Sequence, residues 1–175
     1  MKRFPGMLIL IVSMIFTGHS VIAQNVKFAH INSDDLIRAL PDYDSAMAKL
    51  QRTQTELQNT LELMQVELNN KYDTYTKTES TLTDLVRQSK QQEIQDLQRR
   101  IQNFTTQAQT TLQDEQVKLT QPIFDKIDKA IKDVGKEGGF IYVFDVAQSK
   151  GQVLYFDPAK STDILPQVKT KLGVQ

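Results

Sequence analysis

One uninterrupted stretch constrains this chain more than any other feature: residues 43–120 contain no glycine and no proline. Gly and Pro are the residues that most disfavour a helix, so their absence from 78 consecutive positions predicts continuous helix. The flanking segments, 24–42 and 121–175, differ in character. Apart from Pro5, Gly6 and Gly18, they hold all the Gly and Pro of the chain, and they show the alternating apolar patterns that are typical of strands.

An apolar stripe with a seven-residue repeat runs along the first half of this stretch. Eight of its ten positions are apolar or aromatic, the spacing of a coiled-coil seam: Tyr43, Leu50, Leu57, Met64, Lys71 and Met47, Gln54, Leu61, Leu68, Tyr75. A second stripe follows at Ile94, Leu97, Ile101, Phe104 and Ala108. It continues one position out of phase at Leu112 and Leu119, a step that resembles a stutter.

The segment between the two stripes, Thr78 to Asp84, is rich in Ser and Thr, which compete with helical hydrogen bonds. Thr83 before Asp84 is typical of a helix N-cap. We therefore expect the chain to reverse near 79–83, giving arms 43–79 and 84–120 of about 55 Å each. The alternative is a single helix of over about 100 Å that forms a parallel dimer.

The N-terminus has the three-part pattern of a secretory signal. Lys2 and Arg3 precede the apolar run 7–16, and small residues follow up to Ala23. We predict cleavage after Ala23 and a periplasmic product; the alternative is an uncleaved membrane anchor. Loss of Lys2 and Arg3 leaves 19 basic against 21 acidic residues, a mature charge of −2.

The segments 24–42 and 121–175 are expected to form one small discontinuous body. Strands are predicted at 25–31, 140–146 and 152–156, the last two as a hairpin that turns at 149–151. A short helix is predicted at 165–172, and Gly138-Gly139 is expected to end the helix before the strands. Open strand edges on so small a body favour self-association, and the residues assigned to this oligomerisation body are Phe28, Ile31, Tyr142, Phe144, Leu154 and Phe156.

Pro122 interrupts a helical pattern at the junction of the body and the second arm. It lacks an N–H, and its ring clashes with the carbonyl of Lys118, so a kink or a helix end is expected there. We assign it as a hinge.

The composition of the chain excludes most kinds of catalytic and metal-binding site. The chain has no Cys, and His30 is the only His of the mature sequence, so neither a thiolate nor a multi-histidine metal site is expected. No phosphate-binding glycine motif occurs, and Asp34-Asp35 is interpreted as a helix cap. A formal charge of zero argues against a nucleic-acid partner. We expect that the protein is not an enzyme and that it binds no cofactor and no metal.

The arms remain as the candidate binding surface. Most of their apolar residues are expected only to join one arm to the other. A two-helix hairpin has too little bulk to bury many large side chains at its far end, however, so some are expected to contact a partner weakly at many points: Tyr72, Tyr75, Leu82, Leu85, Val86 and Phe104.

The order of these segments resembles the Skp (OmpH) family of periplasmic chaperones. The matching stretches are 26–31 leading to Leu40-Pro41-Asp42-Tyr43, 122–127 with Ala130-Ile131, 142–145, and 154–157. The resemblance implies a homotrimer whose bodies form a small β-barrel-like base from which helical hairpins project like tentacles around a cavity. That cavity would shelter unfolded outer-membrane β-barrel proteins without ATP. Well-known members are strongly basic, so the near-neutral charge here argues against capture of acidic clients, anionic lipid or lipopolysaccharide.

The expected fold class is therefore mainly α with a small β part: a long antiparallel helical hairpin on a three-stranded association domain, as a trimer. The expected function is that of an ATP-independent holdase for unfolded outer-membrane proteins. The alternative is a structural coiled-coil spacer or adaptor of the envelope that binds one folded partner near the tip, at 82–86.

Overall fold

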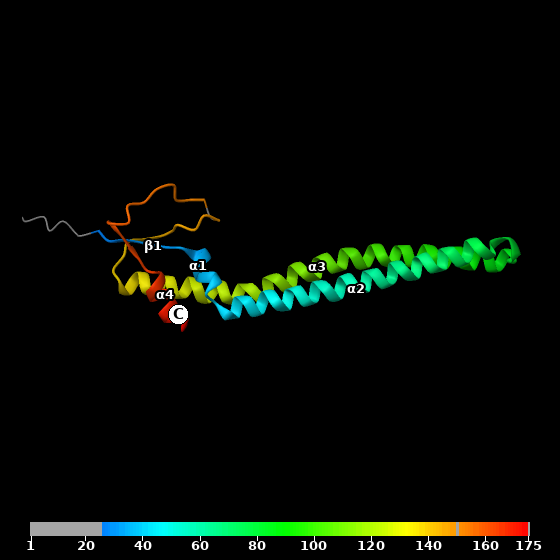
Figure 1. Cartoon of the computed structure of the whole chain (residues 1–175), viewed down its shortest axis with the longest axis horizontal. Helices are drawn as coiled ribbons and strands as arrows, with labels where there is room; N and C mark the ends of the chain where they lie inside the picture. Colours follow the sequence, from blue (N-terminus) through cyan, green and yellow to red (C-terminus); the bar gives the residue numbers. More distant parts are fainter. Residues whose placement is uncertain (1–25, 150, 175) are drawn as a thin grey trace, which may run out of the picture.

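The computed structural model of the chain describes residues 26–149 and 151–174. Two long helices lie side by side and project from a small body that contains the sheet (Figure 1). The expected fold class, a long antiparallel helical hairpin with a small three-stranded sheet, is confirmed. The predicted signal segment and its cleavage site lie outside the described residues.

The hairpin consists of α2 (Pro41–Thr78) and α3 (Asp84–Glu137), which span about 57 and 81 Å. Between them lie a single 3₁₀ turn, η1 (Glu79–Thr81), and the extended residues Leu82 and Thr83. Thr83 occupies the N-cap position of α3, but its side chain makes no capping hydrogen bond there. The reversal therefore depends on the extended backbone of two residues rather than on a side-chain cap.

α3 continues through Pro122 to Glu137, where Gly138 caps it and Gly139 takes a positive φ of 66°. The helix does not end at Pro122, so of the two outcomes expected there only a kink remains. Pro122 removes one backbone hydrogen bond from the helix, the bond that would end on the carbonyl of Lys118. Its role as a hinge stays a prediction.

The sheet differs from the predicted hairpin. Its strands are β1 (Phe28–Ile31), β2 (Tyr142–Asp145) and β3 (Ser161–Asp163), in the order β2-β1-β3, and both pairs are parallel. Residues 152–156 form no strand, so the prediction of an antiparallel pair with 140–146 was wrong.

Burial explains this difference. Leu154 is 96% exposed in the single chain and gains nothing from folding back on β2, whereas Ile164, next to β3, is fully buried. The Ile164 N–H also donates to the His30 carbonyl at 3.1 Å. Anchoring Ile164 in the core therefore brings 161–163, rather than 152–156, alongside β1.

The core lies between the inner face of the sheet, α1 (Ser33–Arg38), the base of the hairpin and α4 (Leu165–Leu172). Ala29 and Ile31 alternate inward from β1 and meet Ile127 and Val134 of α3. α4 begins with Pro in its first turn and ends at Gly173, whose φ is 76°, as predicted. Within the described residues, no helix is long and apolar enough to cross a membrane.

Candidate functional site

The seam between the arms follows the predicted heptads. All ten of the heptad positions on α2 are half-buried, and Ile94 and Leu97 of α3 are buried against them. Beyond Ala108 the half-buried positions shift to Leu112 and Leu119, in agreement with the predicted change of phase. A seam of half-buried residues leaves the rest of each helix surface in contact with solvent.

Two ion pairs join the arms. Lys49 Nζ lies 3.2 Å from Glu115 Oε1, and Lys71 Nζ lies 3.1 Å from Glu93 Oε2. In both pairs the partners are equally far from Leu82 along the chain, so the pairs fix a register in which the arms reverse around Leu82.

These contacts also change proton affinities. Hydrogen bonds from Lys71 and then Lys90 hold the pKa of Glu93 below its usual value. Lys49 and then Lys118 lower the pKa of Glu115 in the same way. Both carboxylates are therefore stabilised in their charged form by the folded hairpin.

Near the tip, Tyr75 provides a further contact between the arms. Its hydroxyl donates to Glu79 Oε1 at 2.7 Å and accepts from Gln91 Nε2 at 2.7 Å. The bond to the Glu79 carboxylate raises the pKa of Tyr75. Tyr75 is half-buried, so its ring belongs to the seam more than to the free surface.

The other predicted contact residues are distributed around the hairpin. Tyr72 is 59% and Leu85 78% exposed, Val86 is partly exposed, and Leu82 is half-buried at the reversal. Phe104 is half-buried and lines a groove of about 620 Å³ with Met64 and Arg100. The structure does not bring the six residues together into one patch.

Sequence reasoning missed two exposed apolar residues, Leu63 and Val66. Leu63 is 70% exposed, and both residues line a groove of about 400 Å³ between the arms that also contains Lys71 and Glu93. A signal was present in the sequence. Leu63 lies between Leu61 and Met64 of the seam, and neither heptad series includes it.

The outer face of the sheet carries an aromatic cluster. In the observed register Phe28 pairs with Tyr142, and both side chains point to the face that does not meet the core. The rings of Phe28, Tyr142 and Phe144 lie 5.9–6.4 Å apart, and all three are exposed. Of the other predicted oligomerisation residues, Leu154 is exposed, whereas Ile31 is in the core of its own chain.

His30 lies on this outer face as well. Its Nδ1 is 2.9 Å from Ser161 Oγ, and its ring centroid is 4.4 Å from that of Phe156. Ser161 belongs to β3 itself, and Phe156 belongs to the segment before it, so His30 contacts both. In the described part of the chain no group of three potential metal ligands occurs, and His30 is accounted for by packing and one hydrogen bond.

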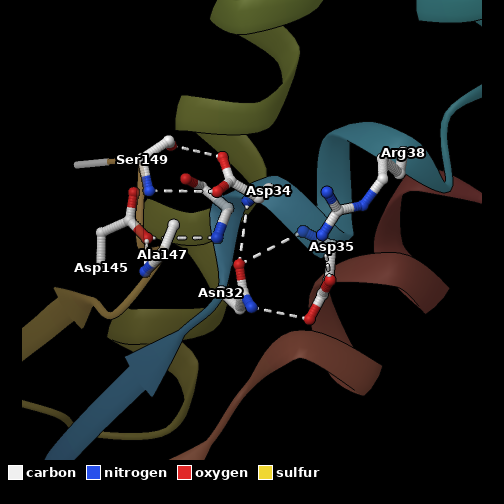
Figure 2. A network of polar contacts seen from close by, with 8 residues as sticks. Asn32, Asp34, Asp35, Arg38, Asp145, Ala147 and Ser149 are labelled. Atoms are coloured by element: carbon white, nitrogen blue, oxygen red, sulfur yellow. Dashed lines mark hydrogen bonds and ion pairs between the residues drawn. The ribbon is translucent and has the colours of Figure 1, made fainter. Parts of the chain in front are cut away.

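Figure 2 shows the polar network at the start of α1. The Asn32 side chain accepts from the N–H groups of Asp34 at 3.1 Å and Asp35 at 3.3 Å. Asn32 is therefore the helix cap, and the prediction that Asp34-Asp35 forms the cap was wrong, because the two acids occupy the first turn itself.

The same network ties β2 and the loop after it to α1. Asp145 Oδ1 accepts from the N–H groups of Ser33 and Ala147 at 3.1 and 3.0 Å, and the Ser149 hydroxyl donates to Asp34 at 2.6 Å (Figure 2). These carboxylates accept from donors of the chain itself. The cluster is thus a structural link between two segments far apart in sequence.

The fold and these surfaces define a class: a protein with a small body that contains the sheet, two long arms that project from it, and exposed apolar side chains distributed along the arms. Comparison with family models places residues 27–172 in the family described as Outer membrane protein (OmpH-like). The chain therefore belongs to the OmpH-like family. This family is periplasmic and non-enzymatic, and membership supports a general chaperone role.

A solved structure agrees with the fold. The crystal structure of a putative outer membrane chaperone (OmpH-like) from Caulobacter crescentus matches with a TM-score of 0.70 at 14% identity. The match covers 84% of this chain and 83% of the other. Comparison with curated proteins gave no match.

Proposed function

We propose that the protein is an ATP-independent holdase of the periplasm that keeps unfolded outer-membrane β-barrel proteins from aggregating. The observation that carries the proposal is the exposure of large apolar side chains along the arms, above all Leu63, Tyr72 and Leu85. A hairpin that served only as a spacer would gain solubility from polar residues at these positions.

The mechanism follows from the shape of the arms. Unfolded barrel strands alternate apolar and polar residues and aggregate through their edges. Scattered apolar contacts are individually weak, but several arms holding one chain gain avidity without fixing its conformation. Binding then stabilises the unfolded client against aggregation by mass action. The proposed contact residues are the six predicted ones with two additions from the structure: Tyr72, Tyr75, Leu82, Leu85, Val86, Phe104, Leu63 and Val66.

Light scattering tests the holding activity. A urea-unfolded outer-membrane barrel protein is diluted with and without excess mature chain, and we expect scattering to be suppressed. The combined variant Leu63→Ser/Tyr72→Ser/Leu85→Ser should lose most of the suppression. Its matched control is Thr55→Ser/Thr76→Ser/Thr106→Ser, which changes exposed polar positions on the same arms. Unchanged aggregation with the wild-type chain would refute the holdase function.

The clients are expected to lie in a cavity between the arms of a homotrimer. The support is the aromatic cluster Phe28, Tyr142 and Phe144 on the uncovered face of the sheet, together with the exposed Leu154. Sedimentation equilibrium and small-angle scattering test copy number and elongation together. We expect a trimer for the wild-type chain and a smaller species for Tyr142→Glu/Phe144→Glu, with a folded body verified by circular dichroism.

Pro122 is proposed as the hinge that sets how far the arms splay. It lies within α3, directly before Ile123, which belongs to the core of the body. Spin labels at the exposed residues Thr81 and Lys160 report the distance from tip to body. Pro122→Ala restores a helical N–H and should narrow the distance distribution. An unchanged distribution would remove the hinge role.

The predicted secretory signal belongs to this proposal, since a periplasmic role requires export and removal of residues 1–23. Mass spectrometry of the intact exported protein should give the mass of a chain that begins at Gln24.

The spacer or adaptor function is the second candidate, supported by the exposure of Leu85 and Val86 beside the reversal. It predicts one folded partner bound at the tip. Capture from native envelope distinguishes the two, because a mixed set of barrel proteins supports the holdase and one stoichiometric partner supports the adaptor.

A further inference from the structure

The glutamines of the arms are not distributed evenly around the hairpin. α3 carries Gln at five successive heptad positions, with two more in the adjoining series, and α2 carries three: Gln88, Gln95, Gln102, Gln109, Gln116; Gln91, Gln98; Gln51, Gln58, Gln65. All ten are exposed. Residues seven apart lie on one side of a coiled-coil helix, so each series forms a continuous row. We name these ten residues the glutamine face.

The rows of the two arms lie on the same flank of the hairpin. On α2 the row follows the seam residues Leu57 and Met64 by one position, and on α3 Gln95 and Gln102 follow Ile94 and Ile101 by one. In an antiparallel pair of right-handed helices, positions displaced in the same sense from the seam face the same side.

The contacts between the arms agree with this placement. The bond from Gln91 to Tyr75 joins the arms on the glutamine face. The Lys71–Glu93 ion pair and the two grooves described above lie on the opposite flank, and none of the ten glutamines lines either groove.

The two flanks differ sharply in charge. On the glutamine face, the heptad series between residues 48–76 and 88–116 contain one charged residue, Glu62. The corresponding series on the opposite flank, between 46–77 and 86–117, contain eight: Lys49, Glu56, Glu67, Lys77, Glu93, Asp96, Arg100 and Asp114. Solvation requires polar residues on both flanks but does not by itself separate charged from uncharged ones, so the asymmetry calls for another explanation.

We infer that the glutamine face is the surface that contacts the main chain of the unfolded client. This inference rests on the proposed holdase function and names the chemistry by which the arms recognise their partner. A Gln side chain offers two N–H donors and a carbonyl acceptor. An unfolded polypeptide presents an unpaired N–H and C=O at almost every residue. The uncharged face therefore complements the uncharged backbone that all clients share.

The arrangement accounts for binding by a chain whose mature charge is only −2. Amide-to-backbone hydrogen bonds exchange readily with water, so each is weak, and rows of them along two arms act together. Because neither side of such a contact is charged, the binding is insensitive to salt, unlike capture by an oppositely charged surface. Because the backbone is the ligand, it is also insensitive to client sequence.

The experiment compares two triple variants of the full mature chain. Gln95→Ala/Gln102→Ala/Gln109→Ala alters the glutamine face, and Gln92→Ala/Gln107→Ala/Gln121→Ala removes three exposed glutamines of the same helix outside it. The probe is a fluorescently labelled, urea-unfolded eight-stranded outer-membrane barrel protein, with the Kd measured by anisotropy in 50 and 500 mM NaCl.

We expect the face triple to weaken binding by about fivefold or more and the control triple by less than about twofold. The wild-type Kd should change by less than about threefold between the two salt concentrations. A photo-crosslinking residue at Gln102 should label the client more strongly than one at Gln92.

The opposite results overturn the inference. Equal effects of the two triples, or strong salt dependence, would show that another surface holds the client while leaving the holdase function intact. A face triple that loses its oligomeric state in sedimentation would assign the face to contact between copies of the chain. A wild-type chain that fails to bind the client would remove the proposed function together with this inference.

Discussion

The body contains three large side chains with no exposed surface: Leu36 in α1, Ile164 directly after β3 and Val168 in α4. Along the arms, between residues 50 and 115, only Ile94 and Leu97 are buried. The body thus has a packed three-dimensional core, whereas the arms are joined only by a narrow seam along their length. The difference indicates that most of the free energy of unfolding comes from the body and that the arms stay accessible to solvent. The proposed holdase function requires such accessible arms.

The largest expected effect comes from the body core. Ile164→Ala should lower the free energy of unfolding by about 3 kcal/mol, because it leaves a cavity in a fully buried site. Ile101→Ala, at a half-buried seam position, should cost about 1 kcal/mol. Urea unfolding at one fixed protein concentration measures both. Equal losses would break the contrast between body and arms.

Within the arms, Leu97 is the most deeply buried large residue. Leu97→Ala should cost about 2 kcal/mol, expressed as local opening of the hairpin rather than unfolding of the whole chain. Hydrogen exchange should accelerate in α2 and α3 near this residue and remain unchanged in β1 and α4. If hydrogen exchange in the sheet accelerates by the same factor, the arms and the body unfold as one unit.

The cap of α1 provides a smaller test on the body. Asn32→Ala removes the acceptor for two N–H groups in the first turn and should cost about 1 kcal/mol. Asn32→Ser keeps an acceptor without placing a second carboxylate beside Asp35, and it should cost less. If urea unfolding shows the two variants to be equally destabilised, the side-chain cap is not what holds α1.

The smallest effect concerns the ion pairs between the arms. The pKa values of Glu93 and Glu115 are lowered in the folded chain, so their contribution is complete at neutral pH. It is lost as the pH falls below the usual range of a glutamate carboxyl and through the lowered pKa values. Spin labels at Gln58 and Gln107 should show a broader distance distribution at pH 3 than at pH 7.

A matched variant isolates this effect. Glu93→Gln should already broaden the distribution at pH 7 and respond less to acid. Glu62→Gln, on the glutamine face and away from this ion pair, should leave the distribution unchanged. If the distribution of the wild-type chain does not depend on pH, the ion pairs add nothing to the hairpin, as is common for exposed pairs.

The arms could be predicted from sequence because their structure is local. Three features of residues 43–120 act over only a few turns of helix: the absence of Gly and Pro, the heptad repeat and the Ser/Thr-rich interruption. Their structure therefore follows from local sequence. The same holds for α4, whose first-turn Pro166 and terminal Gly173 set its limits. Leu63 and Val66 escaped notice because apolar residues outside a heptad look ordinary until their exposure is known.

The sheet could not be predicted in the same way. Its parallel pairing joins β1 to strands more than a hundred residues away, and burial of Ile164 in the shared core places 161–163 beside β1. The local pattern favoured 152–156 as the partner of 140–146 and gave no signal for 161–163, because the deciding contact is distant in sequence. Local sequence patterns thus specify the helices, their reversal and the cap that Asn32 gives α1, whereas tertiary packing sets the strand order and the flank of the hairpin that holds its grooves, because it alone brings distant segments together.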